Sequence, residues 1–593
     1  MTVSSKSIYN DLQIVKAKLN GISPSMCMAK WLQVSLHLPQ GLTQSCYHPP
    51  THSIDINEIK NNPNALHNTT KKISERRQMR QGIRPEGCQY CWNLEDGGHN
   101  SDRHYRSSEP WAQRAWEEVV KPEKDHNINP RYVEVNFNQS CNFKCTYCSP
   151  HLSTTWEKEI DELGPIKIGK KLHNDLNSLA EQGLMPIASA NKQNPYVQAF
   201  WKWWPELYKT IEVFRMTGGE PLMDKNTFRV LDYVNHNPNT KLELSITSNM
   251  CPPNQELFSK FIAKVKDIEG GLTPSLFKSW KQNGYLKEVL YYAENNGHWN
   301  WKEWPRYIVE KVDDDNDEIA PKTKRVSFNE INLKQRKTPL QDNHMRDETT
   351  GDFLYKLIWY KPVNQKTWTC LGSEEWNESG NSGIFIDTNK LKSLMLFVSV
   401  DAVGERAEYI RTGLDWNRFS DNVKTFLSET KNTEMSFINT FNFFSITSLK
   451  EFLKFVLELR LQYAGEEDHQ SRIWFDIPYL RDPKWMSAQI AVNFPSLITI
   501  IENCVKFMQR NRQSTTKIGF HQYEIDKVIR LIEWIKSAEQ YVKEDSNIQN
   551  QIICYDYFTQ IDERRNTNIR EVFPELVDVW DYFEYLKDLQ QEI

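Results

Sequence analysis

The chain has 593 residues, of which 39% are hydrophobic and 12% aromatic, so it is long enough to form two or three domains with sizeable cores. Its formal net charge of −5 provides no overall basic field, which disfavours nucleic acid as a partner without excluding a local basic patch. No stretch approaches the roughly 18 apolar residues of a membrane span, and the N-terminus lacks the apolar core of a secretory signal. We therefore expect a soluble, cytoplasmic protein without a membrane partner.

The cysteines are unevenly distributed, since seven of the eleven fall within residues 27–148. A reducing compartment disfavours a disulfide framework, so these clustered cysteines need a metal explanation. The other four occur singly, and a lone buried cysteine usually packs as a small hydrophobic side chain. They are Cys251, Cys370, Cys504 and Cys554.

Residues 20–125 contain turn signals such as SPS, HPP and NNPN, which predict a small loop-rich domain held together by a metal. From residue 131 onward, strand patterns alternate with helical spacing, which predicts parallel βα units in an open or closed α/β barrel. The expected strands are 132–138, 211–220, 241–249, 394–402, 435–444 and 472–480.

Residues 266–390 interrupt this rhythm and predict an insertion, partly folded and partly mobile, between the third and fourth strands. Its acidic run EKVDDDNDE (310–318) is more simply a solvated loop than a metal site. The aromatic and cationic runs 201–209 and 299–307 suit base stacking, although such runs more often belong to a core or an interface. The last ninety or so residues have helical spacing. We expect three domains, covering residues 1–125, 126–500 and 501–593.

The sequence CNFKCTYC (141–148), here called the three-cysteine loop, follows the first expected strand. A disulfide would leave one cysteine over, and a structural zinc site needs a fourth ligand that no nearby residue supplies. A [4Fe–4S] cluster on Cys141, Cys145 and Cys148 fits best, because it leaves one iron open for a ligand. Sites in α/β folds also lie at the carboxyl ends of strands.

The three-cysteine loop resembles the C-x3-C-x2-C motif of the radical SAM superfamily, in which an aromatic residue, here Tyr147, precedes the last cysteine. TGGEP (217–221) ends the second strand and resembles the GGEP motif of that family. The resemblance implies that Gly218, Gly219, Glu220 and Pro221 hold the amino group of S-adenosylmethionine. Glycines let backbone carbonyls approach an ammonium group, and Glu220 adds negative charge.

Weaker resemblances follow at the ends of later strands. SITSNM implies that Ser248 and Asn249 contact the ribose, and the segment 397–413 implies that Arg411 pairs with the methionine carboxylate. Strand-end capping or a surface position is an equally simple explanation for each of these residues. NTFN (439–442) and residues 476–490 resemble later family segments, in which we interpret Asn442 and Pro483 as structural.

Four cysteines precede the first barrel strand and form the four-cysteine set, consisting of Cys27, Cys46, Cys88 and Cys91. The first two bracket a hairpin-like run with Gly41 near its turn. The pattern resembles the auxiliary-cluster domain called twitch or SPASM, and its N-terminal position resembles a group of radical SAM proteins common in phages. Many relatives have paired cysteines where this chain has SCYHP, so a second [4Fe–4S] cluster, zinc and no metal all stay open. We interpret His48 as an ordinary loop histidine.

The resemblance implies an α/β fold: a partial (β/α)6 barrel with a small N-terminal iron–sulfur domain and a C-terminal helical segment. It implies an enzyme that reductively cleaves S-adenosylmethionine to a 5′-deoxyadenosyl radical, which abstracts hydrogen from a substrate. A peptide or protein side chain is the first candidate substrate, and a flavodoxin or ferredoxin is the expected electron donor. If the protein is phage-encoded, its compartment is the host cytoplasm. The alternatives are a non-catalytic iron–sulfur or zinc-stapled binding protein and a zinc-dependent nucleic-acid-binding protein.

Overall fold

The computed structural model describes twelve stretches of the chain, which separate into two compact units. The first unit comprises Met1–Phe228, Glu243–Ile262 and Ser393–Ile593, and the second comprises Arg229–Leu242 and Ala263–Lys392. The described residues are 5–169, 171–187, 193–270, 285–295, 298–303, 355–364, 367–376, 382–385, 390–463, 472–513, 518–541 and 544–592.

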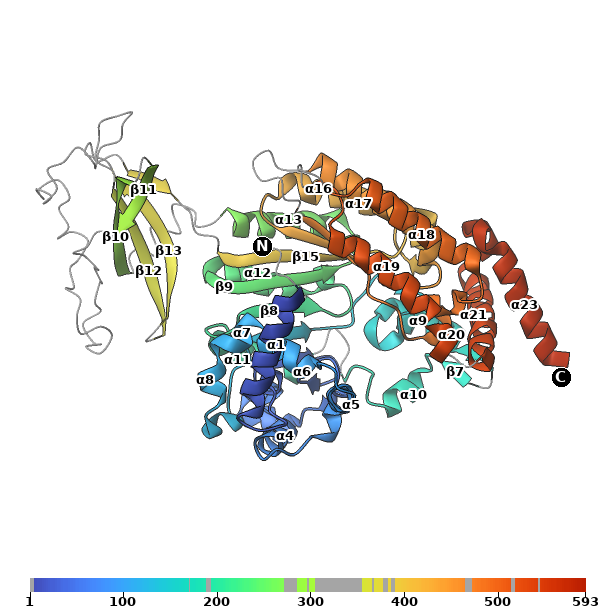
Figure 1. Ribbon diagram of the computed structural model, residues 1–593, viewed down its shortest axis with the longest axis horizontal. Helices are drawn as coiled ribbons and strands as arrows, with labels where there is room; N and C mark the ends of the chain where they lie inside the picture. The colour runs from blue at the N-terminus through green and yellow to red at the C-terminus, as the bar shows by residue number, and fades with distance from the viewer. Residues whose placement is uncertain are drawn as a thin grey trace, which may run out of the picture. The chain divides into compact units, whose positions relative to one another are not determined.

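The main sheet contains the six expected barrel strands, which lie side by side in chain order (Figure 1). The neighbouring pairs β4–β8, β8–β9, β15–β17 and β17–β18 are parallel. These observations confirm the predicted strands and an α/β fold with a mostly parallel sheet, which is consistent with a partial barrel. The strands are β4 (Tyr132–Asn136), β8 (Val213–Thr217), β9 (Asn239–Ser248), β15 (Leu391–Ser399), β17 (Glu434–Ile438) and β18 (Ile473–Asp476).

Helices connect consecutive strands, as βα units require. Their apolar residues recur at helical spacing, so each buries one face; in α16, for example, Phe419, Val423 and Phe426 are buried. The connecting helices are α9 (Thr154–Leu163) and α11 (Pro195–Leu207) after β4, α12 (Lys225–His236) after β8, α13 (Gln255–Glu269) after β9, α15 (Glu405–Ile410) and α16 (Trp416–Glu429) after β15, and α17 (Ser445–Gln462) after β17.

Three N-terminal strands extend the same sheet beyond β4. Strand β1 (Gln33–His37) is parallel to β4, and β2 (Leu42–Gln44) and β3 (His52–Ser53) follow in antiparallel order. The turn between β1 and β2 contains Gly41 at φ +67°, where a side chain would overlap the ring of Tyr196. This turn confirms the predicted hairpin. The domain boundary at residue 125 stays a prediction.

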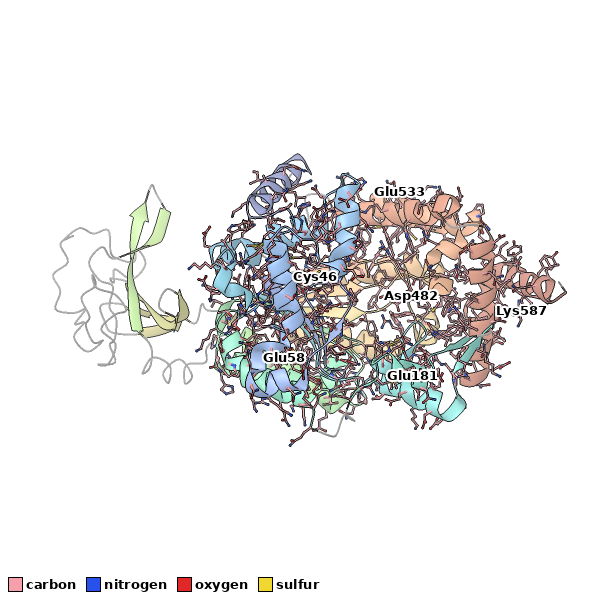
Figure 2. The ribbon with its side chains drawn as sticks, turned by 90° about the horizontal axis from the view of Figure 1, so that it is seen from below. Cys46, Glu58, Glu181, Asp482, Glu533 and Lys587 are labelled. Atoms are coloured by element: carbon pink, nitrogen blue, oxygen red, sulfur yellow. The ribbon has the colours of Figure 1, made fainter. Side chains whose placement is uncertain are left out.

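The N-terminal segment is more helical than its turn signals predict. Its helices are short, and their stability comes from packing around buried tryptophans such as Trp31, Trp92 and Trp111 rather than from length. They are α1 (Ser5–Asn20), α2 (Met28–Leu32), α3 (Ile56–Asn61), α4 (Thr70–Arg80), α5 (Gln89–Asp96), α6 (Asp102–Ser108), α7 (Pro110–Arg114) and α8 (Trp116–Val119). Figure 2 shows Cys46 among these helices.

The insertion contributes a five-stranded antiparallel sheet to the second unit, in the order β11-β10-β12-β13-β14. The acidic run 310–318 and residues 304–307 of the second aromatic run lie outside the described residues. The strands are β10 (Tyr285–Asn295), β11 (His298–Glu303), β12 (Tyr355–Asn364), β13 (Thr367–Trp376) and β14 (Ser382–Phe385).

The C-terminal region is helical, as predicted, and its long helix α21 (Glu544–Arg565) packs against the hairpin β6 (Ile166–Ile168) and β7 (Lys171–His173). Within the first aromatic run, Trp203 and Trp204 are buried core residues, which leaves them unavailable for base stacking. No described helix is both long and apolar enough to cross a membrane. The other helices of this region are α18 (Pro495–Arg510), α19 (Gln522–Lys536), α20 (Ala538–Tyr541), α22 (Ile569–Val572) and α23 (Val577–Glu592).

Candidate functional site

The three-cysteine loop lies directly after β4, at the carboxyl end of the first barrel strand. Its middle forms the short strand β5 (Lys144–Cys145), which pairs antiparallel with β16 (Arg411–Thr412), a segment that follows the fourth barrel strand. The backbone N–H of Thr146 donates to the carbonyl of Ile410 at 2.8 Å, and the Tyr557 hydroxyl donates to the carbonyl of Thr146 at 2.6 Å. Chain segments distant in sequence therefore fix the loop on two sides.

The start of α9 satisfies the loop's buried carbonyl groups. The Ser153 hydroxyl caps the helix by accepting from the N–H of Trp156. The Thr155 hydroxyl donates to the carbonyl of Cys141 at 2.5 Å, and the Trp156 indole donates to the carbonyl of Cys145 at 2.8 Å. The protein thus satisfies these backbone carbonyls, which fixes the backbone that carries the three thiols.

Burial raises the pKa of all three loop thiols. For Cys148 the value rises to about 12, and the charge of Cys145 adds to the effect of burial there and at Cys141. Burial also raises the pKa of Cys145, although the nearby Arg411 opposes this shift. The thiols are therefore close enough to interact, and holding them as thiolates requires strong positive charge, which a metal centre supplies.

Within the part of the chain that the structure describes, no group of three or more His, Cys, Asp or Glu side chains could hold a metal ion. The thiolates of a four-iron cubane lie farther apart than those around one zinc ion. The choice between an iron–sulfur cluster and zinc therefore stays a prediction for both cysteine groups.

The GGE turn (218–220) packs against the residues that lead into the three-cysteine loop. Gly218 has φ +94°, and a side chain there would overlap the side chain of Asn136. A side chain at Gly219 would overlap the backbone of Ser140, whose carbonyl accepts from the N–H of Glu220 at 2.6 Å. Only glycine permits this close approach, so the two sequence motifs form one structural site. Pro221 is buried directly after the turn.

Glu220 is a buried acceptor, with 2% of its surface exposed. It accepts from the N–H of Leu222 at 2.9 Å, the hydroxyl of Ser248 at 2.8 Å and the N–H of Asn249 at 2.6 Å. Burial raises its pKa to about 7. The Asn249 amide also donates to Asn142 of the three-cysteine loop at 3.0 Å. Ser248 and Asn249 therefore hold Glu220 and the loop together, and their contact with a ribose stays a prediction.

Asp401 joins the other predicted residues and was not itself predicted as a site residue. Its buried carboxylate pairs with the guanidinium of Arg411, with 2.8 Å between Oδ2 and Nε. It also accepts from the Tyr147 hydroxyl at 2.7 Å and the N–H of Thr440 at 2.8 Å. Arg411 reaches to 3.7 Å from the sulfur of Cys145. Asp401 lies within the segment 397–413 that resembles the family, and this was the available sequence signal. The pairing of Arg411 with a ligand carboxylate stays a prediction.

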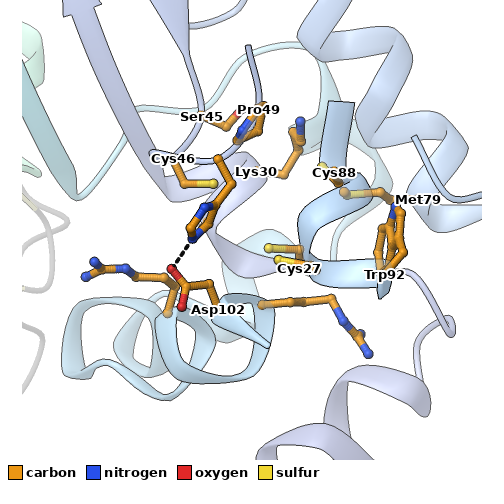
Figure 3. Close-up of a pocket in the computed structure, with 14 residues that line it drawn as sticks. Cys27, Lys30, Ser45, Cys46, Pro49, Met79, Cys88, Trp92 and Asp102 are labelled. Carbon is orange, nitrogen blue, oxygen red and sulfur yellow. Dashed lines mark hydrogen bonds and ion pairs between the residues drawn. The ribbon is translucent and has the colours of Figure 1, made fainter. Parts of the chain in front are cut away.

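The structure brings the four-cysteine set together around one pocket, whose empty space is about 410 Å³ including its mouth. Figure 3 shows Cys27, Cys46 and Cys88 around this pocket, together with Lys30. Burial raises the pKa of all four thiols, to about 12 for Cys27 and Cys46 and to about 11 for Cys91. Metal binding by the set stays a prediction. Asn442 only caps its own turn, where it accepts from the N–H of Phe444.

His48 lines the same pocket and is held firmly. Its Nε2 lies 2.6 Å from a carboxylate oxygen of Asp102, and its ring stacks on Tyr90 with 3.7 Å between centroids. These contacts fix the residues that follow Cys46.

No protein-family model and no solved structure matches the chain. Among curated proteins, it is 26% identical over 168 residues to a GTP 3′,8-cyclase of Syntrophomonas wolfei subsp. wolfei, and 28% identical over 118 residues to a GTP 3′,8-cyclase of Trichodesmium erythraeum. GTP 3′,8-cyclases are radical SAM enzymes. The similarity supports the predicted relationship of this chain to the radical SAM superfamily.

These matches are partial. They span 28% and 20% of this chain, and only 41% and 27% of the respective relatives. Radical SAM relatives carry a [4Fe–4S] cluster and S-adenosylmethionine, which agrees with the chemistry of the three-cysteine loop. The resemblance to twitch domains and to phage proteins stays a prediction.

Proposed function

We propose that this protein is a radical SAM enzyme whose Cys141, Cys145 and Cys148 hold a [4Fe–4S] cluster. The observation that carries the proposal is the packing of the GGE turn against the three-cysteine loop at the carboxyl ends of neighbouring strands. When bound, the cluster and S-adenosylmethionine supply a 5′-deoxyadenosyl radical that abstracts hydrogen from a substrate. The protein's own residues bind and orient these groups and keep water away from them.

Glu220 suits the binding of an ammonium group. A carboxylate has about four acceptor positions, and three described donors occupy three of them. An ammonium placed at the remaining position would favour the ionised carboxylate, which burial alone disfavours. The absence of side chains at Gly218 and Gly219 lets this part of the backbone lie close to the loop.

We further propose a second [4Fe–4S] cluster on the four-cysteine set, in a domain of the twitch or SPASM type. Four thiols line one pocket, two of them buried and two half-buried. Because burial raises their pKa values, a partner that binds them as thiolates must supply strong positive charge, as a metal cluster does. Zinc is the alternative occupant, and metal analysis of the purified chain distinguishes the two.

The substrate that we propose is a peptide or protein side chain, with a flavodoxin or ferredoxin as electron donor. The names of the two similar proteins give GTP as their substrate, so GTP is the competitor to test. Both candidates require the same first step at the three-cysteine loop, which can be measured without knowing the substrate.

Anaerobic reconstitution tests this proposal. The purified chain is loaded with iron and sulfide, and 5′-deoxyadenosine is measured after addition of S-adenosylmethionine and dithionite. We expect about eight irons per chain, as two cubanes require, together with release of the nucleoside. The variant with Cys141, Cys145 and Cys148 changed to alanine should bind about four irons and release none. A loaded wild-type chain that releases no nucleoside with several reductants would contradict the proposed function.

A further inference from the structure

Lys30 is a buried cation in the wall of the four-cysteine pocket. It lies one helical turn after Cys27, whose carbonyl accepts from the N–H of Lys30 at 3.2 Å. The residue is 2% exposed, and its ammonium lies 2.6 Å from a carboxylate oxygen of Glu75. Burying a lysine costs free energy unless an opposite charge compensates its own. The groups around the ammonium should therefore indicate the role of this residue.

The ammonium of Lys30 faces the cysteines as well as Glu75. The ion pair with Glu75 keeps the ammonium charged in this buried position. Lys30 lines this pocket together with Cys88 and the other three cysteines. Lys30 therefore places a fixed positive charge in the wall of the pocket that the four-cysteine set lines.

Glu75 also pairs with a second lysine, Lys71, which is exposed and lies outside the pocket wall. Lys71 pairs with the other oxygen of Glu75 at 3.4 Å, but the Lys71 side chain is 54% exposed and does not line the pocket. A role in the pocket therefore predicts that Lys30 affects a bound cluster more than Lys71 does, because only Lys30 lines the pocket.

Hydrogen bonds to cluster sulfurs and nearby charge set the reduction potential of an iron–sulfur centre. Reduction by one electron makes a thiolate-bound cluster more negative, and a buried cation stabilises the more negative state. We propose that Lys30, positioned by Glu75, raises the reduction potential of a cluster held by the four-cysteine set. This inference rests on the second cluster proposed above.

The test isolates the four-cysteine set by changing Cys141, Cys145 and Cys148 to alanine and adding Lys30→Met or Lys71→Met. Iron and sulfide are counted, and the midpoint potential is measured by reductive titration followed by electron paramagnetic resonance. Lys30→Met should lower the equilibrium constant for one-electron reduction at least tenfold, which corresponds to about 59 mV. Lys71→Met should shift the midpoint much less, because that charge is exposed to solvent and lies outside the pocket wall. Lys30→Arg keeps the charge, so its midpoint potential should lie close to that of the chain with Lys30.

A second route covers the case in which Lys30→Met fails to fold. Glu75→Gln leaves the ammonium without its counter-charge, so the potential should rise. The same potentials can be measured in the chain with all its cysteines, where the signal that S-adenosylmethionine leaves unchanged belongs to the four-cysteine set.

The possible failures are distinguishable. Equal midpoints for the Lys30 and Lys71 variants, or no rise with Glu75→Gln, would overturn the inference and leave the second cluster in place. No iron, or a redox-silent metal, in the isolated four-cysteine set would overturn the second cluster and this inference together. Release of 5′-deoxyadenosine by the wild-type chain would then still support the radical chemistry at the three-cysteine loop.

Discussion

At the scale of single residues, Glu220 links the two strand ends on which the proposed site depends. Its carboxylate is buried and takes its donors from its own turn and from Ser248 and Asn249 after the next strand. One side chain thus aligns the ends of β8 and β9 beside the three-cysteine loop. Substitution here should affect ligand binding more than the integrity of the fold.

Glu220→Gln should reduce release of 5′-deoxyadenosine and weaken binding of S-adenosylmethionine by at least tenfold. The amide has one acceptor oxygen in place of two and carries no charge, and a lost charged hydrogen bond is worth about 1.5–3 kcal/mol. Equilibrium binding measurements on the loaded enzyme check this. Glu206→Gln, on the outer helix α11, is the control. Equal affinity in both variants would argue against a role for Glu220 in binding.

The pH dependence of stability provides a second prediction for Glu220. Its pKa is raised from 4.5 to about 7 by burial, so between these values the folded state binds more protons than the unfolded state. The free energy of unfolding of the metal-free protein should therefore fall as the pH rises from 4.5 to 7, with this group contributing roughly 3 kcal/mol. Urea unfolding at several pH values measures the slope. In Glu220→Gln this part of the slope should disappear, and an unchanged slope would contradict the assignment.

At the scale of elements, the three-cysteine loop depends on segments far from it in sequence. The antiparallel pairing of β5 with β16 brings the end of the fourth strand onto the loop, and Gly413 at φ +110° allows its close approach to Asn142 and Phe143. On another side, α21 contributes the buried hydroxyl of Tyr557 to the carbonyl of Thr146. The C-terminal helices therefore support the candidate site directly.

Tyr557→Phe should weaken this support without creating a cavity. Removing the hydroxyl leaves the buried carbonyl of Thr146 without that donor, which costs about 1–3 kcal/mol. We expect a lower melting temperature and faster loss of iron from the three-cysteine loop on dilution. Tyr585→Phe on α23, where the residue is 57% exposed, is the matched control and should change neither quantity. Equal iron loss in the two variants would show that α21 does not support the loop.

At the scale of the whole molecule, local sequence patterns predicted the barrel strands and the C-terminal helices because each buries an apolar face. They also picked out both cysteine groups: a short motif holds the three-cysteine loop, whereas the four-cysteine set comes together only through the fold. They did not reveal Asp401 as the partner of Arg411, because that pairing depends on how β16 meets β5. They did not reveal Lys30 either, because a lysine near a cysteine carries no sequence signal until the fold buries it. The helical content of residues 20–125 was missed because short helices rely on tertiary packing.

Removing the N-terminal segment tests whether residues 1–125 form an independent domain. A self-contained domain of residues 1–125 could be removed without harm to the rest, but β1 pairs with β4 from Gln33 opposite Tyr132 to His37 opposite Asn136. Removal would expose the backbone edge of β4, which invites aggregation. We therefore expect the fragment 126–593 to be insoluble or to bind fewer irons than the three-cysteine loop requires.

The matched deletion removes residues 271–389 and joins the ends by a short Gly-Ser linker. Lys390 lies beside the end of α13, where its ammonium donates to the carbonyl of Asp267 at 2.7 Å, so a short linker can close the gap. The strands β10 to β14 form their own sheet, and its removal leaves the order of the main sheet intact. This variant should fold and bind the same number of irons as the wild-type chain, as sedimentation and iron analysis would measure. A soluble, iron-loaded 126–593 fragment would instead establish the N-terminal segment as an independent domain, because β4 would then tolerate an open edge.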